Sequence, residues 1–182
     1  MSERRYLLSC LVACAILMSS MAAGAANLAI EAFAGKWQGS AVSESDISVH
    51  FRLTSRDIDV EVRPQSDGFA ITWNTVQRQT GNPSNPVERL KSTSLSFRAA
   101  GPNLWASRDN ADPLTSGAPY VWATVKERTL VISSLRIYAD GRHELQIYRR
   151  TLSGTGMTLD FERLVDGENV RRASGRLVKV AR

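Results

Sequence analysis

Hydrophobic and polar residues alternate along most of the chain beyond its N-terminal segment. Over residues 47–54 the odd positions are apolar and the even positions polar, and Ile58 and Val60 repeat the pattern between acidic neighbours. A period of two places the apolar side chains on one face of a β-strand and the polar side chains on the other. The pattern therefore predicts a series of strands, each with one solvated face.

About eleven strand segments follow from this alternation. They are 36–43, 47–54, 57–63, 68–77, 89–98, 103–108, 119–126, 129–139, 142–152, 156–165 and 168–180. Asp-Gly dipeptides at 67–68, 140–141 and 166–167 separate neighbouring segments, and this dipeptide favours the tight turns of β-hairpins. Helical spacing is confined to 27–35, which predicts one short helical turn before the first strand.

The strands must close into a barrel or stack on a second sheet, because a sheet with free edges pairs with other chains. Short consecutive hairpins favour an up-and-down barrel over a Greek-key sandwich. We therefore expect an all-β chain that forms a single antiparallel up-and-down β-barrel of about eight to ten strands over residues 27–182. Acidic residues at 57, 59 and 61 argue against a lipid-facing exterior and place the apolar side inside.

The first 26 residues have the features of an export signal. Arg4 and Arg5 are followed by a mostly apolar stretch over 6–21 and by small residues over 22–26. We therefore expect cleavage after Ala25 or Ala26 and a periplasmic or secreted protein.

Cleavage at that site would remove both cysteines, Cys10 and Cys14, and leave no thiol for a disulfide, a metal site or a nucleophile. Two alternatives remain open. The stretch is an uncleaved membrane anchor, or Cys14 is the lipid-modified residue of a lipoprotein.

Composition is that of one soluble globular domain. The 182 residues are 43% hydrophobic and 23% charged, which excludes collagen, low-complexity disorder and a disulfide scaffold. The formal net charge of +5 mainly favours solubility. Export argues against a nucleic-acid partner, while contact with an envelope protein or an anionic membrane surface remains open.

The segment Gly35-Lys36-Trp37 resembles the Gly-x-Trp entry to the first strand of lipocalins and of the wider calycin superfamily. The resemblance implies that Trp37 plugs the closed end of the barrel and packs against an arginine from a late strand. Arg163 is the favoured partner and Arg176 the next, since each shares a strand face with apolar residues. A cation over an indole ring contributes about 0.5–2 kcal/mol.

The resemblance also implies a ligand carboxylate bound by an inward arginine, as in fatty-acid-binding relatives. Arg149 is the candidate for this role, and the alternative is that it reaches solvent at a strand end.

Aromatic residues indicate where a ligand would bind. Phe69 and Trp73 share a face of one predicted strand, and Phe97 and Trp122 lie on others. Aromatic side chains line small-molecule sites, but they also fill the core of small barrels. Both interpretations remain open.

No catalytic or metal-binding motif is apparent. His50 and His143 are the only histidines, and neither has other ligands at metal spacing, so we expect no metal or cofactor. We expect an exported, non-catalytic barrel that binds a small apolar or amphipathic molecule. The alternative is a structural or interaction module of the cell envelope with a fully packed core, and a barrel-fold enzyme would need an ionisable pair that the sequence does not identify.

Overall fold

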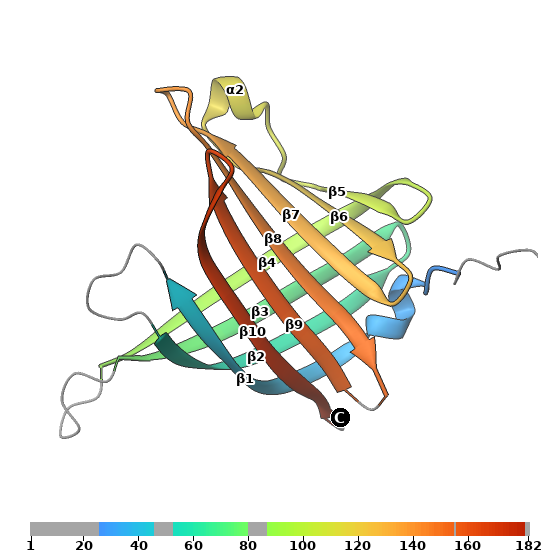
Figure 1. The fold of residues 1–182 in the computed structure, drawn as a ribbon. Coiled ribbons are helices and arrows are strands. Elements are labelled where there is room, and N and C mark those ends of the chain that lie inside the picture. Colours follow the sequence, from blue (N-terminus) through green and yellow to red (C-terminus); the bar gives the residue numbers. More distant parts are fainter. Residues whose placement is uncertain (1–25, 46–52, 80–86, 155, 181–182) are drawn as a thin grey trace, which may run out of the picture.

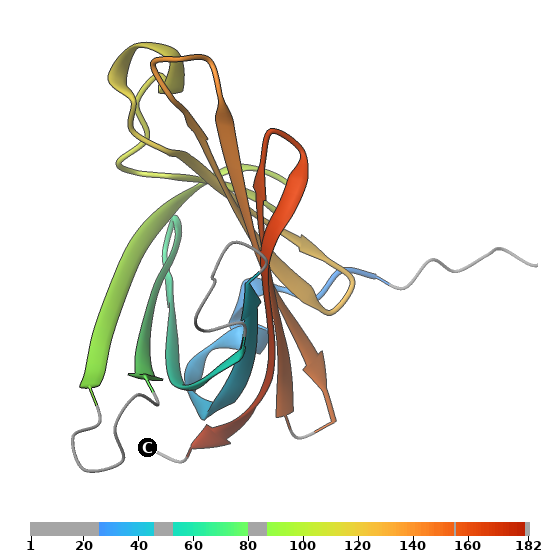
Figure 2. The same cartoon turned by 60° about the vertical axis from the view of Figure 1, so that its left-hand side comes forward.

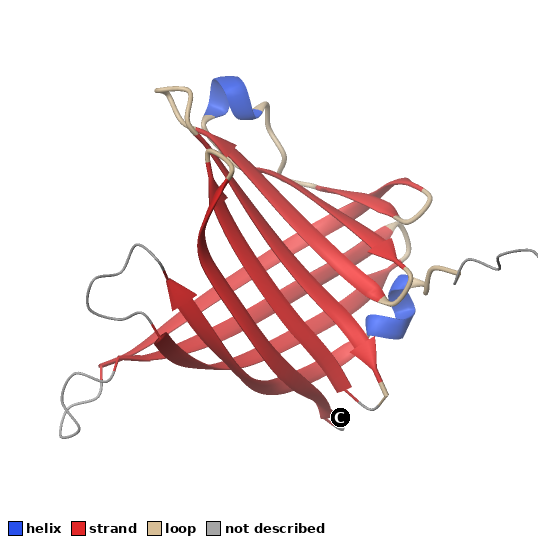
Figure 3. Cartoon of the chain, in the orientation of Figure 1, coloured by secondary structure: helices blue, strands red, loops and turns tan. Residues whose placement is uncertain are grey.

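The computed structural model describes residues 26–45, 53–79, 87–154 and 156–180, and it is almost entirely β (Figure 3). Its elements are η1 (Ile30–Phe33), β1 (Gly35–Ser45), β2 (Leu53–Gln65), β3 (Gly68–Gln79), β4 (Val87–Gly101), β5 (Leu104–Ser107), α2 (Pro113–Ser116), β6 (Tyr120–Lys126), β7 (Thr129–Ile137), β8 (His143–Ser153), β9 (Gly156–Val165) and β10 (Glu168–Val180). The predicted helical turn is η1. The predicted signal, both cysteines and most of the predicted strand 47–54 lie outside the described residues.

Each described strand pairs antiparallel with the next strand along the chain, and β1 pairs with β10 to close the barrel (Figure 1). The up-and-down barrel predicted from the alternation is therefore confirmed. The acidic residues of β2 point outward as expected, since Ile58 and Val60 are buried between them.

The barrel has two different ends. The turns after β2, β4, β6 and β8 lie at the end where η1 is found, and we call this the closed end (Figure 1). A hydrogen bond of 2.8 Å from the Leu28 amide to the Glu127 carbonyl joins the N-terminal segment to this end. The opposite end, which we call the mouth, has α2 and the hairpins after β7 and β9 above it (Figure 2).

Trp37 plugs the closed end together with η1. The indole is 4% exposed, and its Nε1 donates to the Phe33 carbonyl over 3.0 Å. The cation over its ring is Lys179, with Nζ 5.3 Å from the centroid, because Lys179 is paired with Trp37 in the β1–β10 register. The predicted pairing of Trp37 with Arg163 is wrong, since the Arg163 guanidinium donates to Glu144.

Three aromatic rings fill the core next to the β2–β3 and β4–β5 turns. Phe69 and Phe97 are 0% exposed and stack at 4.7 Å, and Trp105 packs edge-on against Phe69 at 5.6 Å. Phe69 and Phe97 therefore lie in packed core rather than against an open cavity.

The three predicted Asp-Gly hairpins are present, but the glycines act differently. Asp166 and Gly167 both have positive φ, 50° and 86°, as a two-residue hairpin turn requires. Gly68 lies within β3, where a Cβ would be 2.1 Å from the Phe97 carbonyl oxygen. This glycine permits close approach of β3 and β4.

Gly39 has a similar role where β1 meets β10. A Cβ at Gly39 would lie 2.0 Å from the Arg176 carbonyl oxygen, so Gly39→Ala must push apart the strands that close the barrel. We expect it to lower the free energy of unfolding by about 1–3 kcal/mol in urea titrations. Gly101→Ala is the control, because its Cβ would meet only side-chain atoms of Leu104, at 3.8 Å. Equal losses in the two variants would contradict the prediction.

No helix within the described ranges has the length and apolar character to cross a bilayer.

Candidate functional site

A cavity of about 540 Å³ occupies the half of the barrel interior nearer the mouth. Side chains from seven of the strands line it, and they include Ile58, Leu159 and Phe161 as apolar wall. A second cavity of about 390 Å³ adjoins it and shares Trp73 and Tyr148 with it. The interior is therefore open toward the mouth and packed toward the closed end.

Trp73 and Tyr148 meet across the interior. They come from β3 and β8, which lie on opposite sides of the ring of ten described strands, and their ring centroids are 5.1 Å apart. Tyr148 also contacts Phe161 of β9 at 4.8 Å. We call the two cavities the first and the second chamber: β3, β4, β7 and β8 line both, the first also reaches β2, β9 and β10, and the second also reaches β6.

Arg150 lies at the floor of the first chamber and is 0% exposed. Its guanidinium carbon is 4.9 Å from the Trp73 ring centroid and 5.8 Å from that of Tyr148. Its Nε and Nη1 are buried, and neither has a hydrogen-bond partner among the described residues. Burial lowers the pKa of Arg150 to about 10, so the group still carries its charge at neutral pH.

A buried charge without a carboxylate partner is costly, and cation–π contact offsets only part of that cost, about 0.5–2 kcal/mol. Among described residues, no acid contacts Arg150. A carboxylate that reached this guanidinium would recover the lost solvation and gain charge-assisted hydrogen bonds, so the arrangement is suited to binding an anion.

The inner face of β8 is polar and forms a hydrogen-bonded chain toward the mouth. The Tyr148 hydroxyl donates to Gln146 over 2.6 Å, and the Gln146 amide donates to Glu144. Glu144 also accepts from Arg163 Nη2 at 2.6 Å and from the Tyr138 hydroxyl at 2.9 Å. The chain fixes the Tyr148 ring, and burial raises the pKa of its phenol, which stays protonated.

Glu144 is the acid of this cavity, and it is buried. Burial alone would raise its pKa, but hydrogen bonds from Arg163, Gln146 and Tyr138 outweigh that effect and hold the pKa below its ordinary value of 4.5. The carboxylate is therefore ionised at neutral pH and already has its partners.

Glu144→Gln is expected to lower the free energy of unfolding by about 1–3 kcal/mol at neutral pH, because Arg163 loses its charged acceptor. Since the pKa is lower in the folded state than in the unfolded state, this stabilisation is present above about pH 4.5 and is lost as the pH falls through the folded-state pKa. Urea unfolding of both proteins across this range measures it. A difference that persists undiminished in acid would contradict it.

Positive charge is concentrated in this cavity. Its basic residues are Arg56, Lys91, Arg136, Arg150, Arg163 and Arg171. The lining contains one carboxylate, that of Glu144. The formal charge of the lining is therefore +5, which equals the formal net charge of the whole chain.

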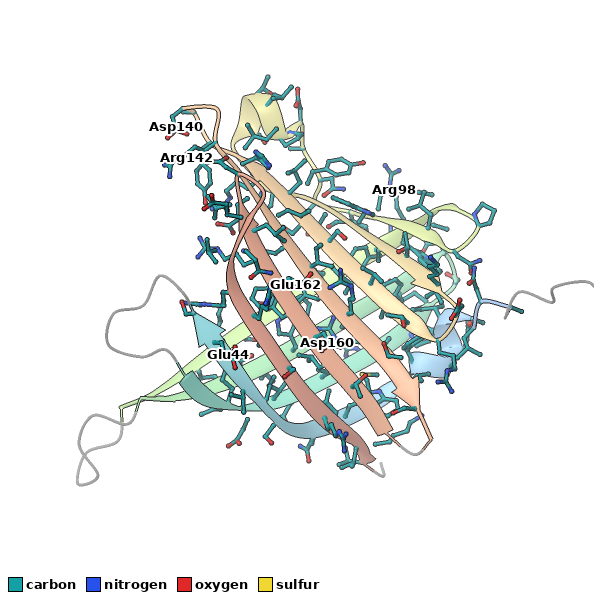
Figure 4. All side chains as sticks on the ribbon, viewed as in Figure 1. Glu44, Arg98, Asp140, Arg142, Asp160 and Glu162 are labelled. Carbon is teal, nitrogen blue, oxygen red and sulfur yellow. The ribbon has the colours of Figure 1, made fainter. Side chains whose placement is uncertain are left out.

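Several acidic residues, by contrast, lie on the outside. Figure 4 shows Glu44 on β1 and Asp160 and Glu162 on β9, all on the outer surface (Figure 4). The outer surface therefore carries acidic side chains as well as basic ones such as Arg149, whereas the cavity lining is mostly basic.

The structure places the predicted ligand-binding residues in three different environments. Trp73 lines the cavity. Phe69 and Phe97 are in the packed core. Trp122 is on the outer face, where its ring contacts Tyr120 at 6.3 Å, because even-numbered residues of β6 point outward.

Arg149 is also on the outer face, so its predicted role as the inward arginine is wrong. It donates to Glu162 of β9 at 2.9 Å, and its side chain is 39% exposed. The inward residue is its neighbour Arg150. Consecutive strand residues face opposite sides, so one member of the Arg149-Arg150 pair had to point inward, and this dipeptide was the signal in the sequence.

The described part of the chain contains no group of three or more His, Cys, Asp or Glu side chains suited to a metal ion. His143 lies at the mouth, half-exposed, with Nδ1 3.3 Å from Asp166.

No protein-family model and no curated protein sequence matches this chain significantly. Among solved structures, it is similar to a protein of unknown function from the DUF3598 family of Nostoc punctiforme, with a TM-score of 0.53 and 14% identity. That match covers 89% of this chain and 53% of the other, so this chain spans about half of its length. An S-type phycobiliprotein lyase from Guillardia theta is matched over 84% of this chain and 91% of its own, at a TM-score of 0.32 and 8% identity. The likeness to the first extends to the fold, and the closed antiparallel barrel fits a calycin-like architecture.

Proposed function

We propose that the barrel binds a small amphipathic molecule in its interior, and that an acidic group of this molecule pairs with Arg150. The observation that carries the proposal is a fully buried guanidinium at the floor of a 540 Å³ cavity, with no acidic partner among the described residues. A barrel that served only as a structural module would gain stability by filling this space.

Affinity would come from two sources. Burial of the apolar part of the ligand against Trp73, Leu159 and Phe161 contributes about 25 cal/mol per Å² of apolar surface. The acid adds charge-assisted hydrogen bonds to Arg150, in a low-dielectric site where such bonds are strong. The excess positive charge around the cavity would also speed the approach of an anion.

Binding would move the aromatic rings. Because Trp73 and Tyr148 lie over the guanidinium, an acid reaches Arg150 only if the Tyr148 side chain rotates away. That rotation breaks the hydrogen bond from Tyr148 to Gln146. The environment of the Trp73 indole changes at the same time, so binding should alter tryptophan fluorescence.

Titration with dodecanoic acid and with its methyl ester, followed by tryptophan fluorescence and calorimetry, tests the proposal. The two probes have the same chain and differ in charge. We expect the acid to bind at least about tenfold more tightly than the ester, as one charge-assisted interaction predicts. Equal affinities, or no binding of either, would overturn the proposal.

We also retain export as part of the proposal, so that binding would take place outside the cytoplasm. Its support is the sequence of residues 1–26.

A further inference from the structure

A second group of unpaired charges lies nearer the mouth of the first chamber and is not needed to bind one acid. Arg56 of β2 and Arg171 of β10 line the cavity, and the Nε of each is buried without a partner among the described residues. Both side chains line the same cavity, and burial, followed by the charge of Arg171, lowers the pKa of Arg56.

Arg171 is in addition directly opposite Arg163 in the β9–β10 register. Like charges at directly opposed positions destabilise a sheet. Glu144 accepts from Arg163 and neutralises that residue, but among the described residues no carboxylate bonds to Arg171 or Arg56. Arg56, Arg163 and Arg171 therefore line the cavity with a single carboxylate, that of Glu144, which is bonded to Arg163.

Arg171 is separated from Arg150 along the strands. Arg150 is paired with Leu159, whereas Arg171 is paired with Arg163, four residues further along β9 toward the mouth. At about 3.3 Å per residue this places the two levels roughly 13 Å apart along the strand. On β9 the residue that lines the cavity between them is Phe161.

We infer that the ligand is an elongated dianion with an apolar body, whose second acidic group binds between Arg56 and Arg171 while its first pairs with Arg150. This inference rests on the proposed function and specifies the charge of the ligand. An acid between Arg56 and Arg171 would relieve their repulsion and supply the acceptor that both Nε atoms lack.

Calorimetry with α,ω-dicarboxylic acids tests the inference, with octanedioic, dodecanedioic and hexadecanedioic acids compared with dodecanoic acid. We expect at least one of the diacids to bind about tenfold more tightly than dodecanoic acid. Arg171→Gln should remove that advantage by weakening the diacid more than the monoacid. Thermal unfolding of the variant, expected at an unchanged or higher temperature, shows that it is folded.

Arg172→Gln is the matched control, because it removes the same charge from the adjacent, exposed residue on the outer face of β10. It should retain the preference for the diacid. The inference is overturned if no diacid binds more tightly than dodecanoic acid, or if the two variants lose the preference equally. Because dodecanoic acid binding that depends on Arg150 can persist in both cases, failure here is distinct from failure of the proposed function.

Discussion

Arg150→Met is expected to make the protein more stable and to abolish its preference for an acid. The pKa of Arg150, lowered by burial to about 10, corresponds to a cost of roughly 3 kcal/mol for holding the charge in the folded state. The cation–π contacts with Trp73 and Tyr148, worth about 0.5–2 kcal/mol, are lost in the variant. The net gain in the free energy of unfolding should therefore be about 1–3 kcal/mol by urea titration.

The same variant should lose about tenfold or more in affinity for dodecanoic acid while binding the methyl ester as before. A residue that lowers stability but provides affinity is typical of a binding site. Arg149→Met is the matched control, since it removes the same group from the outer face, where it is exposed and paired with Glu162. If Arg150→Met is less stable than the wild type, or if both variants bind the acid normally, the role given to Arg150 is wrong.

The stability difference should also depend on pH in a defined direction. Below about pH 10 Arg150 is charged in both the folded and the unfolded state, and its cost is constant. As the pH rises above about 10, the folded state releases the proton before the unfolded state does, so the wild type gains stability relative to Arg150→Met. Parallel urea titrations of the two proteins should show the difference shrinking over this range.

Trp37→Ala is expected to cause the largest loss of stability, about 3–5 kcal/mol, which thermal or urea unfolding measures. The indole is 4% exposed, and its removal leaves a cavity between η1 and the strands at the closed end. It also leaves Phe33 without the hydrogen bond to its carbonyl.

Trp122→Ala is the comparison for this substitution. It deletes the same side chain from the outer face, where the ring is only partly buried and contacts Tyr120. We expect a clearly smaller loss, about 1–2 kcal/mol. Similar losses for both variants would contradict the role of Trp37 as the plug of the closed end.

The barrel itself was predictable because its local signals agree. Alternation in β2 and β3 and turn residues such as Asp166 and Gly167 all specify short antiparallel neighbours. The partner of Trp37 was not predictable in this way. Lys179 reaches the indole through the pairing of β1 with β10, and this register joins the two ends of the described barrel.

The site was misplaced because the alternation is inverted in β8. There the apolar residues Leu145 and Ile147 face outward, and Leu145 is flanked in register by Leu135 and Leu164, so the outer surface forms its own apolar row. The inner positions are polar because they line a cavity rather than packed core. A rule that places apolar side chains inside fails wherever a barrel keeps polar groups for a ligand, and it therefore selected Arg149 over Arg150.

A crystal structure of the protein with bound dodecanoic acid tests most directly whether the interior is an acid-binding site built around Arg150. We predict the carboxylate within hydrogen-bond distance of Arg150 Nε or Nη1, the Tyr148 ring rotated from its present position, and the alkyl chain against Phe161. A carboxylate at the mouth with Arg150 still covered by the two rings, or a cavity that excludes the acid, would contradict the account.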